Sequence, residues 1–231
     1  MRGKKGRRLK KLRKTKNNMK TRGFLRNLSI TNWILIINIA LFFLFYILIA
    51  VNKSFIDFIA LQPASILQGK YLWTLLASMF MHASISHLLV NMISLFFMGN
   101  FLEKIIGRKR YLLFYFISGL VASLFFIFLS FVFKDDMAKY AVGASGALFG
   151  IGGLLAVLMP KLPVLVFFII PMPLWIAIIF LMFGVWIISY FTGLPIGNTA
   201  HLGGLVAGLI YGFYLRRKYK KKVKLLNRYI R

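Results

Sequence analysis

The sequence predicts an all-α polytopic membrane protein with six transmembrane helices and basic cytosolic tails. Hydrophobic residues make up 60% of the 231-residue chain and charged residues only 15%, with a mean hydropathy of +0.78. Soluble domains average about 45–50% apolar residues and about 25% charged residues. Apolar segments recur at lengths close to the ~17–25 residues of a spanning helix. All 31 lysines and arginines lie outside these segments, which is typical of a membrane protein.

Six apolar segments are predicted to be the membrane helices. In chain order they are Trp33–Val51, Ala83–Leu102, Tyr111–Phe133, Gly143–Met159, Leu174–Thr192 and Thr199–Leu215. The last two belong to a stretch, Leu162–Leu215, that contains no Lys, Arg, Asp or Glu. As one continuous helix this stretch would be about 80 Å long. Because the hydrocarbon core of a membrane is ~30 Å thick, that length is enough for two crossings and a link, but not for three crossings. The turn between them is predicted at Gly193, Pro195, Gly197 and Asn198.

The first external loop, Asn52–His82, is unusually long. Pro63 breaks it, and Ile66–Phe80 is apolar but interrupted by Gly69 and Lys70. We therefore predict an interfacial segment here rather than a seventh span. The chain shows no internal repeat, so the sequence gives no support to an inverted-repeat transporter.

The distribution of positive charge predicts the orientation. Thirteen basic residues lie between Arg2 and Arg26 and nine between Arg216 and Arg231, with no acid in either stretch. The positive-inside rule places both tails in the cytosol, which requires an even number of spans. The loop after the second span is also predicted to be cytosolic because it carries Lys104, Arg108, Lys109 and Arg110.

Three parts follow from this pattern: a basic tail over 1–30, a membrane domain over 31–215 and a second basic tail over 216–231. The first tail is not expected to be a signal peptide, since its basic region is long and no small-residue cleavage site follows the apolar run. Both tails are expected to attract anionic lipid headgroups. RNA or ribosome contact is the alternative, but no specific nucleic acid is expected because aromatic residues for base stacking do not interleave the charges.

Polar side chains in lipid are costly, about 2.5–3.5 kcal/mol for a central charge, and are candidates for function. The three histidines, His82, His87 and His201, lie at or near the predicted outer ends of the second and sixth spans. Asn91 follows His87 by four residues and so shares its helix face. Ser145 opens the fourth span within a Gly-Ala-Ser-Gly string. Topology thus predicts that a serine, two histidines and an asparagine lie at one depth below the outer surface.

Glycines recur every four residues on two of these spans. They are Gly146 and Gly150 on the fourth, and Gly204, Gly208 and Gly212 on the sixth. Small residues at this spacing allow helix backbones to approach closely in lipid. If these faces pack, the serine hydroxyl meets an imidazole, which is how a weak nucleophile is activated. The N-terminus of the serine's helix would then stabilise developing negative charge.

Each feature alone has a structural interpretation. The Gly-Ala-Ser-Gly string is ordinary helix packing, a lone membrane histidine is often a hydrogen-bonded structural residue, and His87 with Asn91 can join two helices. No metal or cofactor is expected: no acid lies near a histidine, as a His-Glu-x-x-His zinc site needs, although a three-histidine zinc site stays open. The absence of cysteine excludes a thiolate nucleophile.

Three motifs, in order on spans two, four and six, resemble those of the rhomboid family of intramembrane serine proteases. The resemblance covers about Trp73–Tyr214. The family's G-x-S-G alone is unspecific, but the three motifs in order are specific. They are His82-Ala83-Ser84-Ile85-Ser86-His87-Leu88-Leu89-Val90-Asn91, Gly143-Ala144-Ser145-Gly146, and Ala200-His201-Leu202-Gly203-Gly204 with Gly208.

The resemblance implies a rhomboid-like six-helix bundle in which Ser145 is the nucleophile and His201 the general base of a two-residue dyad. It implies an oxyanion hole of His87, Asn91 and the serine's backbone amide, with Phe149 stacked on the imidazole. Gly143, Gly146, Gly204, Gly208 and His82 are expected to support this site.

Two further positions are compared with the family pattern. Glu103, four residues after Gly99, resembles the structural G-x-x-x-E at the inner end of the second span. The family's first loop usually carries Trp-Arg, whereas Thr74 follows Trp73 here. This departure concerns the lipid anchoring of the loop and leaves the dyad unaffected.

The function expected is that of an intramembrane serine protease acting on single-span transmembrane substrates near the outer ends of their helices. Its active site is expected to open toward the extracytoplasmic side, above a fourth span that rises only about 21 Å. A non-catalytic rhomboid-like chaperone or trafficking factor is the alternative, although such relatives typically lack the serine or the histidine. A transporter, with His87, Asn91 and His201 lining a polar path, is a third possibility.

Overall fold

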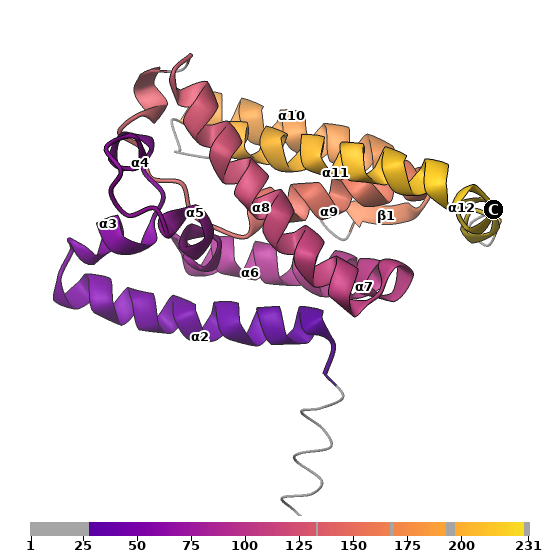
Figure 1. The fold of residues 1–231 in the computed structure, drawn as a ribbon, viewed down its shortest axis with the longest axis horizontal. Helices are drawn as coiled ribbons and strands as arrows, with labels where there is room; N and C mark the ends of the chain where they lie inside the picture. The colour runs from indigo at the N-terminus through magenta and orange to yellow at the C-terminus, as the bar shows by residue number, and fades with distance from the viewer. Residues whose placement is uncertain (1–27, 133, 167–168, 193–196, 229–231) are drawn as a thin grey trace, which may run out of the picture.

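The computed structural model describes residues 28–132, 134–166, 169–192 and 197–228. Nearly all of the predicted N-terminal tail, and most of the turn predicted after the fifth span, lie outside these residues. Each predicted apolar segment forms a helix (Figure 1). These helices are α2 (Ile30–Val51), α6 (Ile85–Ser94) continued by η2 (Leu95–Gly99) and α7 (Asn100–Ile106), α8 (Arg108–Ser130), α9 (Ser145–Leu158), α10 (Leu174–Thr192) and α11 (Asn198–Lys218).

Four of these segments are long and apolar enough to cross a membrane: Ile30–Val51, Ile85–Ile106, Arg108–Ser130 and Leu174–Thr192. The helical membrane protein predicted from composition is therefore confirmed. α9 has 14 residues and is apolar but shorter than a span, as the sequence predicted. The count of six crossings stays a prediction.

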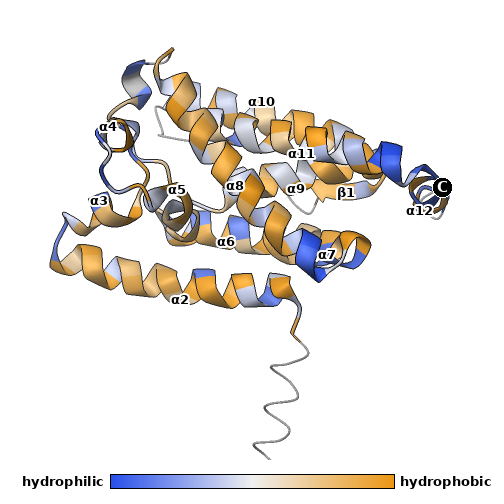
Figure 2. Cartoon of the chain, in the orientation of Figure 1, coloured by the Kyte–Doolittle hydropathy of each residue, from blue (hydrophilic) through white to orange (hydrophobic). Residues whose placement is uncertain are grey.

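The central helix of the bundle is α9. Eleven of its 14 residues are buried, and it packs against α8, α10 and α11. By contrast, α2 lies at the edge of the molecule and buries only Thr31, Ile34, Asn38 and Phe42. The outward faces of α2 and α10 are apolar (Figure 2), as expected of helices whose solvent is lipid.

The first loop contains four short helical segments: α3 (Phe55–Ile59), α4 (Pro63–Leu67), α5 (Thr74–Ala77) and η1 (Ser78–Phe80). The indole Nε1 of Trp73 donates to the Phe58 carbonyl at 2.8 Å. Leu61 and Ala141 exchange two backbone hydrogen bonds of 3.1 and 2.8 Å. This bridge joins the first loop to the segment just before Ser145.

A second contact joins the same two loops. The Tyr140 hydroxyl donates a hydrogen bond to the Asp57 carboxylate. This bond and partial burial raise the pKa of Tyr140 to about 12, so the phenol stays protonated at neutral pH. The loop that precedes α9 is therefore held by both backbone and side-chain contacts.

An antiparallel hairpin of β1 (Pro163–Val166) and β2 (Ile170–Pro173) precedes α10. The all-α prediction omitted it. The stretch is rich in Val and Ile and begins and ends with Pro, which favours short extended segments over helix. Apart from this hairpin the described elements are helical.

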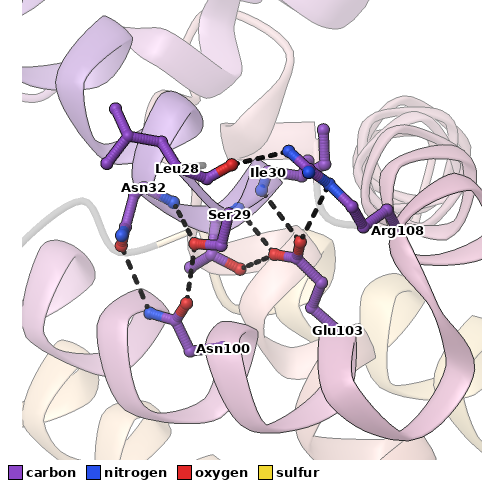
Figure 3. Close-up of polar contacts among 8 residues, drawn as sticks. Leu28, Ser29, Ile30, Asn32, Asn100, Glu103 and Arg108 are labelled. Carbon is purple, nitrogen blue, oxygen red and sulfur yellow. Dashed lines mark hydrogen bonds and ion pairs between the residues drawn. The ribbon is translucent and has the colours of Figure 1, made fainter. Parts of the chain in front are cut away.

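The N-terminus of α2 is held by the buried carboxylate of Glu103 (Figure 3). The carboxylate accepts hydrogen bonds from the backbone amides of Ile30 and Thr31, at 2.9 Å each, and from the Thr31 hydroxyl at 2.8 Å. Arg108 Nε lies 3.6 Å from the same carboxylate. The first amides of a helix have no partner within the helix, and a carboxylate there also suits the helix dipole. Glu103 thus anchors α2 to α7.

Glu103→Ala is expected to lower the free energy of unfolding by about 3 kcal/mol, because a buried hydrogen bond to a charged group contributes about 1.5–3 kcal/mol and three amide or hydroxyl donors lose their partner. Unfolding in detergent micelles measures this. Lys104→Ala, at the exposed neighbouring position, is the control and should change stability by less than about 0.5 kcal/mol. Equal stability of the two variants would contradict the anchoring role.

The C-terminal segment packs against the bundle through Val223 and Asn227, while its basic side chains are exposed. α11 continues past the predicted boundary at residue 215 to Lys218, and α12 (Lys220–Leu226) follows. Val223 of α12 is buried, and Asn227 Nδ2 donates to the Leu158 carbonyl at the end of α9 at 2.7 Å. Residues through Asn227 are therefore in contact with the membrane domain, although the three-part division itself stays a prediction.

Candidate active site

A cavity of about 960 Å³ opens beside the N-terminus of α9. Its lining includes all four polar residues that the sequence placed at one depth, which are Ser145, His201, His87 and Asn91. Apolar residues of α10 form another wall. A few polar groups in a largely apolar cavity are typical of a binding or catalytic site.

Ser145 and His201 are in direct contact. The Oγ of Ser145 lies 2.7 Å from Nε2 of His201, a hydrogen bond between residues 56 positions apart. Ser145 is the first residue of α9 and His201 lies in the first turn of α11. The hydroxyl and imidazole predicted to meet therefore do so.

The contact depends on glycines that let α9 and α11 touch through their backbones. A Cβ on Gly204 would lie 1.9 Å from the Gly146 carbonyl oxygen, and one on Gly208 would lie 2.1 Å from that of Gly150. No side chain fits at either position, so the predicted glycine faces do pack against each other. At Gly204 and Gly208 the two helices therefore approach to backbone contact.

The imidazole of His201 is held by stacking. The rings of Phe149 and His201 are 4.6 Å apart between centroids and inclined by 26°. The His201 side chain is buried, and its Nδ1 has no hydrogen-bond partner among the residues that the structure describes. A dyad without a third, acidic member fits this arrangement, and Phe149 takes the orienting place that a carboxylate has in a triad.

His87 and Asn91 lie together on α6, facing Gly143. Asn91 Nδ2 donates to the His87 carbonyl at 3.0 Å, which leaves its second N–H free of that bond. Gly143 has φ +109°, and a Cβ there would lie 2.8 Å from Cε1 and Nε2 of the His87 ring. Only glycine combines this backbone conformation with such a close approach. Gly143 thus brings the loop before Ser145 against both predicted oxyanion donors.

His82 is buried behind the site. Its ring centroid is 5.2 Å from that of His87, with the two rings nearly perpendicular. Neither ring nitrogen has a hydrogen-bond partner among the described residues. The structure therefore places His82 next to His87, a predicted oxyanion donor.

Sequence reasoning missed the part that α8 plays. Cβ atoms on Gly146 and Gly150 would lie 2.6 Å from the Cβ atoms of Ala122 and Ser118. α8 therefore packs closely against α9, the helix that begins with Ser145, as α11 does. The signal was present as a pair of small residues four apart, Ser118 and Ala122. Ser78 was also missed: its carbonyl accepts the Gly143 amide at 2.9 Å.

Within the described residues, no group of three or more His, Cys, Asp or Glu side chains is placed to hold a metal ion. Of the three histidines in the proposed zinc alternative, His201 is bonded to Ser145 instead. The arrangement has the parts that acyl transfer needs: a hydroxyl with an imidazole beside it, and donors near the place where a carbonyl oxygen would sit.

Comparison with known proteins identifies the family. Residues 69–218 match the Rhomboid domain. The chain belongs to the rhomboid family. The resemblance drawn from the three motifs is thereby confirmed. The rhomboid match begins in the first loop and ends with α11, so it includes every residue that lines the cavity except Leu61.

Curated rhomboid relatives agree with this assignment. The chain is 31% identical over 169 residues to Rhomboid protein 1, mitochondrial, of Saccharomyces cerevisiae and 33% identical over 177 residues to the rhomboid protease GluP of Bacillus subtilis. It is 40% identical over 144 residues to RHOMBOID-like protein 2 of Arabidopsis thaliana. These alignments cover 70%, 74% and 62% of this chain, but only 48%, 32% and 42% of the relatives. The chain thus spans about half or less of the length of these rhomboid relatives.

Proposed function

We propose that this rhomboid protein is an intramembrane serine endopeptidase that uses Ser145 and His201 as a catalytic dyad. The observation that supports this most is the 2.7 Å hydrogen bond between Ser145 Oγ and His201 Nε2, formed inside a cavity that also contains His87 and Asn91. The relative named rhomboid protease GluP belongs to the same family.

The reaction proceeds by acyl transfer. Ser145 Oγ attacks the peptide carbonyl carbon while His201 Nε2 takes its proton, and the carbonyl oxygen becomes an oxyanion. The Ser145 amide at the start of α9, the His87 ring and the second N–H of Asn91 are the proposed donors to that oxyanion. His201 then gives the proton to the leaving amine. In the second step His201 takes a proton from a water molecule, whose oxygen attacks the carbonyl carbon of the ester. His201 then returns the proton to Ser145 Oγ, and the carboxylic acid product leaves.

Single-span transmembrane proteins are the proposed substrates. A scissile bond within a helix is shielded by the helix's own hydrogen bonds, so substrates are expected to carry helix-breaking residues near the cleavage site. The cavity lies at the N-terminus of α9, a helix of only 14 residues, rising about 21 Å. Because this is less than the ~30 Å hydrocarbon core, water has a path to a site below the membrane surface.

The proposed orientation puts both termini in the cytosol and opens the cavity to the extracytoplasmic side. Basic residues gather at the end of the bundle formed by α7, α12 and the last turn of α11 (Figure 2). Ser145 lies at the opposite end of α9 from Leu158, which contacts Asn227 beside α12. The positive-inside rule therefore supports an outward-facing dyad.

A non-catalytic rhomboid-like chaperone or trafficking factor remains the second proposal, since several relatives carry the name RHOMBOID-like protein. The hydrogen-bonded serine and histidine favour the protease over it. They also favour the protease over a transporter, because an imidazole hydrogen-bonded to a serine hydroxyl is the arrangement that activates a nucleophile.

Fluorophosphonate labelling tests the proposal without knowledge of the substrate. The purified protein is expected to be labelled at Ser145 and at no other serine, because the Ser145 hydroxyl hydrogen-bonds an imidazole 2.7 Å away that can activate it. Peptide mapping by mass spectrometry gives the modified position. His201→Ala is expected to lose the label although Ser145 is retained. Absence of labelling in the folded wild-type protein would favour the non-catalytic alternative.

A further inference from the structure

Three cations from three helices gather around one aromatic ring at the basic end of the bundle. The Arg110 guanidinium carbon, in the first turn of α8, lies 5.7 Å from the Tyr219 ring centroid. The Nζ atoms of Lys218, at the end of α11, and Lys222, on α12, each lie 5.8 Å from it. We call Arg110, Lys218, Tyr219 and Lys222 the Tyr219 cluster.

The charges of the Tyr219 cluster are close enough to act together. Because each lies within 5.8 Å of the same centroid, no two are further apart than twice 5.8 Å. This is similar to the Debye length of about 8–10 Å at moderate ionic strength, so solvent ions screen their mutual repulsion only in part. Contact with the ring offsets some of that repulsion, and a bound anion would offset more.

No described acid of the chain ion-pairs with the cluster. The chain has four acidic residues. Glu103 is bonded to the start of α2 and lies near Arg108. Asp136 pairs with Lys139, and Asp57 accepts from Tyr140, both in loops at the other end of the molecule (Figure 1). Asp135 precedes Asp136 in the same loop. Among the residues that the structure describes, therefore, no acidic side chain supplies a counter-ion for the Tyr219 cluster.

Two of the helices that carry the cluster also expose large apolar side chains. On α11, Ile210, Phe213 and Tyr214 are exposed by 66%, 59% and 51%, and on α8 Leu113, one turn beyond Arg110, is exposed by 63%. Cations that adjoin exposed apolar residues match a ligand with a charged head and hydrocarbon chains. A free inorganic anion has no hydrocarbon chain that could contact the exposed apolar side chains.

We propose that the Tyr219 cluster binds the phosphate of an anionic phospholipid. The guanidinium of Arg110 offers paired N–H donors that suit phosphate oxygens. Lys218 Nζ donates to the Tyr214 hydroxyl at 2.8 Å, which leaves two of its three N–H groups for a ligand. Lys222 is exposed and supplies a third charge. The proposal rests on the proposed placement of this end at the cytosolic membrane face and is independent of the dyad.

Native mass spectrometry of the full chain in detergent, with added phosphatidylglycerol or phosphatidylcholine, tests the site. The wild-type protein is expected to retain phosphatidylglycerol in preference. Each cation near an anionic lipid is worth about fivefold in binding, so the triple variant Arg110→Gln/Lys218→Gln/Lys222→Gln should weaken it more than tenfold. The single variant Lys222→Gln, at an exposed position, should weaken it about fivefold even if the triple variant folds poorly.

A matched control removes the same charge from neighbouring exposed positions on α12, with the triple variant Lys220→Gln/Lys221→Gln/Lys224→Gln. It should keep most of the bound phosphatidylglycerol. Equal losses in the two triple variants, or no loss in the first, would overturn the site. Displacement of the lipid by excess inorganic phosphate would indicate that the site binds free phosphate, and would contradict the proposal that its ligand is a phospholipid. Fluorophosphonate labelling of Ser145 in the same samples reports the proposed protease separately.

Discussion

Ser145→Ala is expected to lower the rate of transmembrane substrate cleavage by about 10⁴-fold or more, and His201→Ala by a similar factor. Each removes one half of the 2.7 Å hydrogen bond on which acyl transfer depends. Neither change is expected to unfold the protein, because the backbone contacts of Gly204 and Gly208 with α9 are unaffected. The measurement is cleavage of a panel of single-span substrates by purified protein in lipid vesicles.

The double variant is expected to be no slower than either single one, since the two residues act as a unit and their effects are not additive. Ser94→Ala is the matched control: this serine lines the same cavity without contact to the dyad. It should cleave at close to the wild-type rate. Full activity of Ser145→Ala or of His201→Ala would refute the assignment of the dyad.

Gly204→Ala is expected to lower the free energy of unfolding by more than about 3 kcal/mol and to abolish cleavage. The new Cβ would lie 1.9 Å from the Gly146 carbonyl oxygen. Overpacking a core usually costs about 1–3 kcal/mol, because side chains shift to make room. Here the neighbour is backbone, so α9 and α11 must separate, and Ser145 must move away from His201. Unfolding in detergent and fluorophosphonate labelling of the folded fraction measure the two effects.

Gly184→Ala provides the control for this prediction. Gly184 lies on α10, and a Cβ there would have no atom within 4 Å. The alanine variant should be as stable as the wild type or more stable by about 0.4–1 kcal/mol, because alanine restricts the unfolded chain. If Gly204→Ala proved as stable and as readily labelled as Gly184→Ala, backbone contact would not be what holds the dyad together.

The sequence was most informative where the governing physics is local. Runs of apolar residues predicted each of the long apolar helices to within a few residues, since hydropathy is read one segment at a time. The 14-residue α9 was predicted to be short for the same reason. Glycines at four-residue spacing predicted which faces of α9 and α11 would meet, because only small residues permit backbone contact.

Three features of the structure could not be predicted from the local sequence pattern. The hairpin of β1 and β2 was missed because an apolar run between helices gives no periodicity that separates strand from helix. The contribution of Ser118 and Ala122 was missed because spacing on one helix does not say which neighbouring helix a small-residue face meets. The docking of Val223 against the bundle was missed because the surrounding lysines indicated only a charged tail.

The sequence by itself determined the class of protein, the apolar helices and the identity of the serine, histidines and asparagine at the cavity. The tertiary structure decided that Ser145 Oγ and His201 Nε2 lie 2.7 Å apart, that Phe149 stacks on the imidazole, and that Gly143 adopts φ +109° against His87. The reason is physical: hydropathy and spacing act within one helix. The position of two side chains 56 residues apart depends on how closely two backbones pack.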